Sequence, residues 1–231
     1  MRFLSYFCIF SQPLEDNILT RFSHLIIKKN NMKKVLLING SPRQNGNTHL
    51  ALEEVAKTLQ RQGVETEIAW IGVKPVRGCI ACGNCDGHCA FDDDICNAMI
   101  DKLNAADGLV VGTPTYYGTP NGSVLNLIHR MLYAGAQTDG KPAAAIVVCR
   151  RGGATAAFQS LQMPFQMVNM PLVTSQYWNI VYGRAEGDVA LDAEGLQTMR
   201  TLGNNMAWML KSLDRNSLPD REPWNPTHFI R

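Results

Sequence analysis

The loop from Gly40 to Thr48 combines groups that suit the binding of a phosphate. The residues that could bind a phosphate are Ser41, Arg43, Asn45, Asn47 and Thr48. The loop follows the apolar run 35–38 and leads into a helical pattern, so backbone N–H groups and the helix dipole converge on it. It is neither a Walker A loop nor the Gly-x-Gly-x-x-Gly of dinucleotide folds. We predict a phosphate site here; the alternative is that these residues only build a turn and cap a helix.

Five of the seven cysteines crowd into one short stretch of the chain. They are Cys79, Cys82, Cys85, Cys89 and Cys96. The first four follow the compact spacing Cys-x2-Cys-x2-Cys-x3-Cys, in which several thiolates within about a dozen residues can surround a [4Fe–4S] cluster. Zinc sites more often use two separated pairs of ligands. The first four are therefore candidate cluster ligands, with Cys96 as a substitute for Cys89; free or redox-active thiols and a zinc site are the alternatives.

The hydrophobic pattern predicts five strands with helices between them. The strands are expected at 35–38, 65–70, 108–112, 143–149 and within 172–181. We expect Asn47 to be the N-cap of the first helix, Gly63 to follow its end, and the aspartates at 92–94 to cap the next helix. Apolar strands that alternate with helices indicate a parallel sheet covered on both faces. The sequence therefore predicts an α/β, flavodoxin-like three-layer sandwich with a five-stranded parallel sheet in the order 2-1-3-4-5.

Three motifs in this order resemble one known family. Gly-Ser-Pro-Arg followed by Gly-Asn-Thr, within Gly40 to Thr48, is similar to the phosphate loop of the NAD(P)H-dependent FMN reductase-like family of the flavodoxin superfamily. Gly-Thr-Pro-Thr-Tyr-Tyr-Gly, from Gly112 to Gly118, resembles the family's Pro-x-Tyr-Phe/Tyr-Gly signature, which lines the isoalloxazine ring. The cysteine block upstream of Asp-Asp is similar to that of the iron–sulfur flavoproteins within the family. The resemblance covers residues 33 to 213.

The resemblance implies a bound FMN and a set of residues that hold it. The implied FMN-binding residues are Ser41, Arg43, Asn45, Asn47, Thr48, Pro114, Thr115, Tyr116, Tyr117, Gly118, Arg151, Gly152 and Gly153. A flat cofactor needs an apolar or aromatic surface and backbone groups for its polar edge, which the segment from Pro114 to Gly118 supplies. The alternative for its two tyrosines is an ordinary core pair. Because the flavin does the chemistry, we name no catalytic side chain.

The resemblance also implies a redox function. The expected activity passes electrons from NAD(P)H through FMN to a small acceptor, such as a quinone, a nitro compound, a metal ion or oxygen. The alternative is an iron–sulfur flavoprotein that carries electrons and receives them from a ferredoxin-like partner through a [4Fe–4S] cluster. A zinc-stabilised binding module is a third reading, against which the flavin motifs count. Relatives place FMN near subunit interfaces, which implies a homodimer or homotetramer.

Composition limits the class of protein and its partners. Hydrophobic residues make up 45% of the 231 residues and charged residues 18%, as in an ordinary globular domain. The formal net charge of +2, without a basic run, argues against nucleic acid as a partner. No stretch approaches the roughly 18 apolar residues of a membrane span, so no membrane partner is expected. Clustered cysteines suit a reducing compartment, and we expect a cytoplasmic location.

The chain divides into three expected parts. Residues 1–31 look unlike the rest, and we expect either a poorly ordered extension or the product of an upstream start codon. Met32 opens the first strand, so residues 32–215 are expected to form the FMN-binding domain. Residues 216–231 are rich in proline and polar residues, and we expect them to form a surface tail.

Overall fold

The computed structural model describes residues 32–227, so the predicted extension over 1–31 lies outside the described residues. The parallel strands are β1 (Lys34–Asn39), β2 (Glu65–Trp70), β3 (Gly108–Tyr116), β5 (Ala143–Cys149) and β6 (Ile180–Tyr182). They pair in the order β2-β1-β3-β5-β6, which confirms the predicted order of parallel strands. A sixth, two-residue strand, β4 (Thr119–Pro120), pairs antiparallel with the end of β3. It arises because β3 runs on past the predicted end at 112 and turns back.

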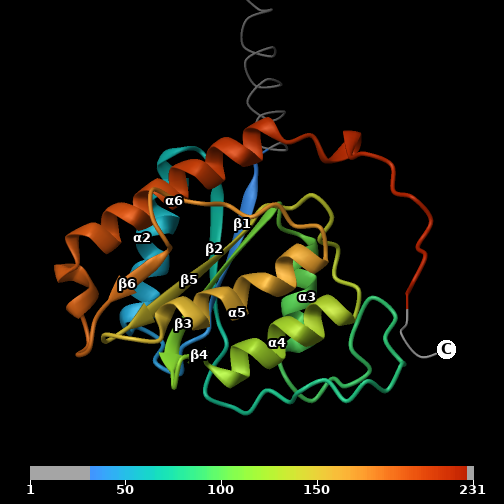
Figure 1. Ribbon diagram of the computed structural model, residues 1–231, viewed down its shortest axis with the longest axis horizontal. Coiled ribbons are helices and arrows are strands. Elements are labelled where there is room, and N and C mark those ends of the chain that lie inside the picture. The colour runs from blue at the N-terminus through green and yellow to red at the C-terminus, as the bar shows by residue number, and fades with distance from the viewer. Residues whose placement is uncertain (1–31, 228–231) are drawn as a thin grey trace, which may run out of the picture. The chain divides into compact units, whose positions relative to one another are not determined.

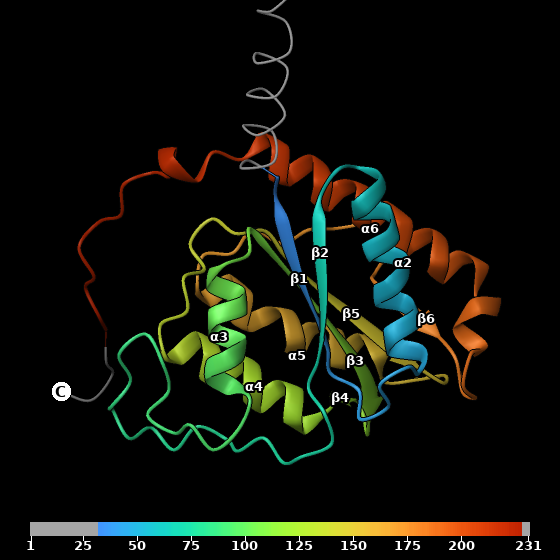
Figure 2. The same cartoon turned by 180° about the vertical axis from the view of Figure 1, so that it is seen from behind.

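Helices cover both faces of the sheet (Figures 1 and 2). They are α2 (Asn47–Arg61), α3 (Cys96–Asn104), α4 (Gly122–Tyr133), α5 (Ala154–Met167) and α6 (Ala193–Ser212), with short 3-10 turns η1 (Asp188–Leu191) and η2 (Arg215–Ser217). Helices α2 and α6 lie on one face, and α3, α4 and α5 lie on the other. The three layers are those the sequence predicts. None of the helices in residues 32–227 is both long and apolar enough to cross a membrane.

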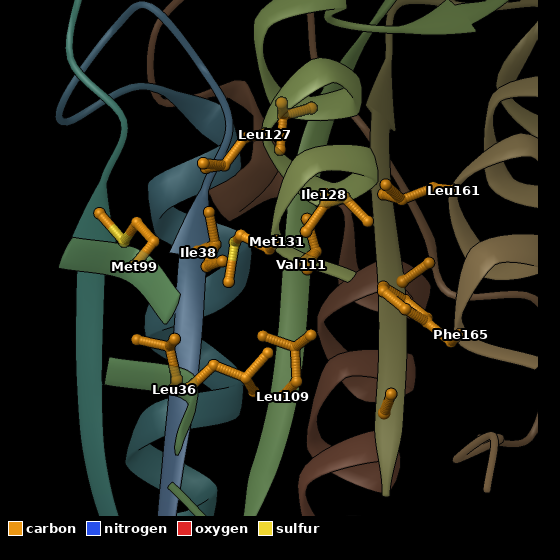
Figure 3. Close-up of a cluster of buried hydrophobic side chains, with 14 of the residues drawn as sticks. Leu36, Ile38, Met99, Leu109, Val111, Leu127, Ile128, Met131, Leu161 and Phe165 are labelled. Carbon is orange, nitrogen blue, oxygen red and sulfur yellow. The ribbon is translucent and has the colours of Figure 1, made fainter. Parts of the chain in front are cut away.

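Strand β1 supplies the core on both faces. Leu36 and Ile38 pack toward α3 and α4, whereas Val35 and Leu37 pack toward α2 and α6, and all four are fully buried. Successive side chains of a strand point to opposite faces, so a strand buried on both faces needs a continuous apolar run. Figure 3 shows the buried side chains on the face of the sheet that α3, α4 and α5 cover, with Met131 of α4 close to Ile38. Strand β1 pairs with β2 on one side and β3 on the other, so its carboxyl end lies within the sheet edge and not at its margin.

The start of helix α2 differs from the prediction. Gly46 is the N-cap residue and makes no side-chain cap, so the prediction of Asn47 as N-cap was wrong. The Asn47 amide instead donates to the Ala185 carbonyl oxygen at 2.7 Å and accepts from the Val189 N–H at 3.4 Å. Its side chain thus joins the loop after β1 to the segment after β6. Gly63, as predicted, follows the helix with a positive φ of 76°.

Candidate functional site

The carboxyl ends of β1, β3 and β5 meet at one edge of the sheet, which is where ligands bind in open α/β sheets. A cavity of about 180 Å³ lies there. Its lining includes the predicted residues Ser41, Arg43, Asn47, Thr48, Pro114, Thr115 and Tyr116. Asn45 is exposed and does not line this cavity. Two of the three predicted loops therefore form one cavity, which ends on the first turn of α2.

Side chains from two strand ends hold the first loop in place. Asn39 is fully buried; its Oδ1 accepts from the Ser41 N–H at 3.1 Å, and its Nδ2 donates to the Gln44 carbonyl at 2.9 Å. Trp70 at the end of β2 donates its Nε1–H to the Ser41 carbonyl oxygen at 2.8 Å. The Ser41 hydroxyl accepts from the Arg43 N–H at 3.1 Å. The loop is thus preorganised before any anion arrives.

A second cleft, of about 380 Å³, lies between the end of β3 and the loop that follows β5. Tyr117 and Gly118 both have positive φ, 51° and 80°, and form the tight turn into β4. Tyr117 is fully exposed and Tyr116 is 44% exposed, so the alternative of a core tyrosine pair was wrong. The tight turn points the Tyr117 side chain outward, and this leaves the cleft open at Tyr117. We call this cleft the ring cleft.

The predicted loop Arg151–Gly153 forms the opposite wall of the ring cleft. Arg151 and Gly152 line it directly. Gly153 has a φ of 84°, and a Cβ there would lie 2.9 Å from the Gly118 Cα atom. Glycine is required at this position because the two loops touch and the backbone is left-handed. All three predicted loops therefore come together at one edge of the sheet.

One buried hydroxyl at this site lacks a partner. Among the described residues, Thr115 Oγ1 is the one buried side-chain oxygen or nitrogen without a hydrogen bond. Thr115 lines both the cavity at α2 and the ring cleft. Leaving a buried donor unsatisfied costs about 1–3 kcal/mol. A ligand with a polar edge at this place relieves that cost, which fits the flavin that the sequence predicts.

Unpaired positive charge gathers along the same edge. Arg43, Arg150 and Arg184 line the cavity at α2, and Arg150 and Arg151 line the ring cleft. Within residues 32–227 none of these four guanidinium groups forms a hydrogen bond or an ion pair, and Glu186 is the one carboxylate in the lining. Sequence reasoning missed Arg150 and Arg184; the position of Arg150 directly after a buried strand was the available signal.

The cysteine segment lies apart from these loops, in the irregular stretch before α3 (Figure 2). Cys79 and Cys82 are exposed, and Cys85 and Cys89 are half-buried against the core. Cys96 is buried at the start of α3, and this burial raises the pKa of its thiol to about 12. Among residues 32–227, no group of three or more histidine, cysteine or acidic side chains is arranged to hold a metal ion. The donor set has the chemistry of a cluster site, but the thiols do not converge.

A buried arginine from α4 anchors this segment. Arg130 is 2% exposed and donates to Cys89 Sγ at 3.2 and 3.4 Å, and it forms an ion pair with Asp94. It also donates to the carbonyl oxygen of Phe91 at 3.2 Å. Burial alone raises the pKa of Cys89, but the Phe91 N–H and the guanidinium outweigh it and the pKa is lowered. Ile95 is the N-cap residue of α3 and makes no side-chain cap, so the prediction that the aspartates at 92–94 cap this helix was wrong. The Asp94 carboxylate, one residue before the N-cap, does accept from the Cys96 N–H at 3.0 Å.

The parallel sheet in the order β2-β1-β3-β5-β6, with a phosphate-type loop and a ring cleft at one edge, defines a flavodoxin-like flavin-binding domain. Residues 33–185 match the family model described as NADPH-dependent FMN reductase, and the chain belongs to this family. It is a flavin-dependent oxidoreductase.

Known proteins resemble the chain in sequence and in fold. It is 33% identical over 193 residues to an iron–sulfur flavoprotein of Methanocaldococcus jannaschii, covering 79% of this chain and 100% of the relative. A structure of RosB with a bound riboflavin-phosphate derivative superposes with a TM-score of 0.63 at 16% identity, over 78% of this chain and 79% of that one. An archaeal flavodoxin superposes with a TM-score of 0.54 at 16% identity, over 77% and 99%. The two structures support the fold alone.

The unpartnered hydroxyl gives a prediction in which two effects have opposite signs. We expect Thr115→Val to stabilise the protein without FMN by about 1 kcal/mol. Valine has nearly the same shape as threonine but lacks the unsatisfied buried hydroxyl. The same variant should bind FMN about five- to tenfold more weakly, because the ligand loses a hydrogen bond. Urea unfolding and a flavin fluorescence titration measure the two effects.

Thr113 provides the matched control on the same strand. Its buried hydroxyl accepts from the Asn121 N–H at 2.9 Å and donates to the Pro114 carbonyl at 3.0 Å. Thr113→Val should therefore destabilise the protein without FMN. If Thr115→Val destabilises it equally, the Thr115 hydroxyl has a partner and the interpretation is wrong.

Proposed function

We propose that this protein passes electrons from NAD(P)H through bound FMN to a small acceptor. The observation that supports this most directly is the open ring cleft, whose rim at Tyr117 is fully exposed. A flavin ring seated there would keep one face accessible to a second flat molecule. When bound, FMN supplies hydride acceptance and electron transfer. An accessible face suits a small acceptor such as a quinone, a nitro compound, a metal ion or oxygen.

The chain's own residues hold and orient the cofactor. The first turn of α2, with Ser41 and Thr48, would bind the phosphate, and Arg43 would neutralise part of its charge. Thr115 Oγ1 would meet the polar part of the cofactor between phosphate and ring. The absence of a side chain at Gly153 lets its loop approach Gly118 closely.

An anaerobic titration tests this proposal. The purified protein, loaded with FMN, should lose its oxidised flavin absorbance when about one equivalent of NADH or NADPH is added, because two electrons reduce one flavin. Adding a quinone should restore the absorbance. A protein that binds FMN but does not respond to either nicotinamide contradicts the proposed donor, and a protein that does not bind FMN contradicts the site.

A second candidate is an iron–sulfur electron carrier, fed by a ferredoxin-like partner. The cysteine block and the full-length similarity to an iron–sulfur flavoprotein favour it. Cys79, Cys82, Cys85 and Cys89 are its proposed ligands. Cys96 is a poorer fourth ligand because it is fully buried in the core and begins α3. Since the thiols do not converge in this structure, loading a cluster requires the segment before α3 to rearrange.

Replacing three cysteines separates the two candidates. Anaerobic reconstitution of the unaltered protein should give iron and sulfide with a broad absorbance shoulder if the chain holds a cluster. The Cys79→Ser/Cys82→Ser/Cys85→Ser variant should then lose both while its FMN content is unchanged. Single Cys89→Ser and Cys96→Ser variants identify the fourth ligand. An unaltered iron and sulfide content in the triple variant would contradict these ligands.

A further inference from the structure

A separate pocket of about 360 Å³ lies beside the ring cleft. It is formed by the start of α5, strand β6 and the start of α6. Arg151 and Gly152 line both this pocket and the ring cleft, so the two spaces are neighbours across one loop. None of the predicted phosphate-loop residues lines it. A molecule that reaches from the ring cleft can therefore extend into this second pocket.

Three half-exposed aromatic side chains line the second pocket. They are Tyr177, Trp178 and Tyr182, with exposed fractions of 63%, 52% and 49%. The ring centroids of Tyr177 and Trp178 are 5.1 Å apart. Aromatic side chains beside an open pocket offer a surface on which a flat, heteroaromatic ring can stack. The first requirement on the ligand is thus a flat ring.

The charges around the pocket give two further requirements. Arg151 has no ion pair within the described residues, and the neighbouring N-terminus of α5 has no side-chain cap, so an anionic group is favoured on that side. On the α6 side, the Asp192 carboxylate already accepts from the N–H groups of Tyr182 and Gly195. Glu194 lines the pocket and forms no ion pair within residues 32–227, and its carboxylate can accept from a hydroxyl group. The pocket therefore suits a ring, an anion and a hydroxyl together.

We propose that this pocket binds the adenosine phosphate end of a nicotinamide dinucleotide, with its other end in the ring cleft. The inference rests on the proposed function, which makes NAD(P)H the electron donor. Adenine would stack on Trp178, a phosphate would face Arg151, and the ribose hydroxyls would face Glu194. An acidic aromatic acceptor has the ring and the anion but lacks the hydroxyls, so adenosine phosphate matches the lining better.

ADP tests the pocket without any redox reaction. Calorimetric titration of the FMN-loaded protein should show ADP binding, and ADP should compete with NADH in the reduction of the flavin. Trp178→Ala should raise the Kd for ADP about tenfold, because base stacking contributes about 1–3 kcal/mol. The matched control is Trp208→Ala on α6, another exposed tryptophan, which does not line the pocket and should leave the Kd unchanged. Arg151→Gln should weaken ADP more than adenosine.

The outcomes separate this inference from the proposed function. If NADH reduces the flavin but ADP does not bind, or binds equally to Trp178→Ala, the pocket assignment is overturned and the function stands. If ADP binds and depends on Trp178 but no nicotinamide reduces the flavin, the pocket stands and the function fails. Binding of anthraquinone-2-sulfonate in place of ADP, lost in Trp178→Ala, would assign the pocket to an acidic acceptor and overturn the inference.

Discussion

Replacing Arg130 by methionine should lower the free energy of unfolding by about 3–5 kcal/mol, because it leaves a buried carboxylate without its counter-charge. The side chain of Asp94 is only 8% exposed and pairs with Arg130. Two carbonyl oxygens, of Phe91 and Arg77, and the Cys89 sulfur also lose their donor. Methionine is long enough to fill much of the space, so the loss is mainly electrostatic. Urea denaturation of the FMN-free protein measures it.

Two further variants identify the cause of that loss. Arg200→Met removes an ion pair with Glu54 in which both side chains are partly exposed, and it should cost less than about 1 kcal/mol. Arg130→Met combined with Asp94→Leu should recover part of the lost stability, because the buried charge is gone. Asp94→Leu alone completes the comparison. If the loss of stability in the double variant equals the sum of the losses in Arg130→Met and Asp94→Leu, packing and not the unpaired charge explains the effect.

Replacing Arg43 by glutamine should raise the Kd for FMN about 10- to 100-fold, because a charge-assisted hydrogen bond to phosphate contributes about 1.5–3 kcal/mol. Arg43 lines the cavity at the start of α2, where backbone N–H groups and the helix dipole also favour an anion. Flavin fluorescence measures the Kd, and its salt dependence should be smaller in the variant.

Two controls assign this effect to the phosphate. Arg61→Gln changes the same residue type at the last residue of α2, the end of that helix away from the loop that carries Arg43, and should leave the Kd for FMN unchanged. Riboflavin, which lacks the phosphate, should bind the unaltered protein and Arg43→Gln equally. A similar loss for riboflavin would show that Arg43 contacts the ring or shapes the loop instead.

The strand order and some element bounds could be predicted because they depend on local patterns, although the fifth strand, predicted within 172–181, is β6 at Ile180–Tyr182 and ends beyond that range. The predicted strands 65–70 and 143–149 agree with β2 and β5 at both ends. A strand buried on both faces needs an unbroken apolar run, and the alternation of such runs with helices leaves few possible topologies. The N-cap of α2 could not be predicted in the same way. The Asn47 side chain donates to the carbonyl oxygen of Ala185, far along the chain, and no local pattern reveals that contact.

In the candidate site, too, the features that depend on local sequence could be predicted and those that depend on long-range contacts could not. Motif residues in the first two loops could be recognised because their order and spacing are local, and the fold then brings them to one edge. Three features could not be recognised from the sequence: the buried charge of Arg130, the unpartnered hydroxyl of Thr115 and the exposure of Tyr117. Each depends on atoms from several distant segments. Free energies of burial and pairing are set by the complete surroundings of a group.

The sequence by itself thus determined the class of domain, the loops proposed to bind phosphate and ring, and the stretch in which the cysteines lie. Only the tertiary structure decided that four arginines without an ion pair in residues 32–227 gather beside those loops and that a second pocket adjoins the ring cleft. It also decided that, within the described part of the chain, the four predicted cluster ligands do not converge. The physical reason is that spacing along a chain limits which groups can meet. Whether they do meet depends on the packing of the elements between them.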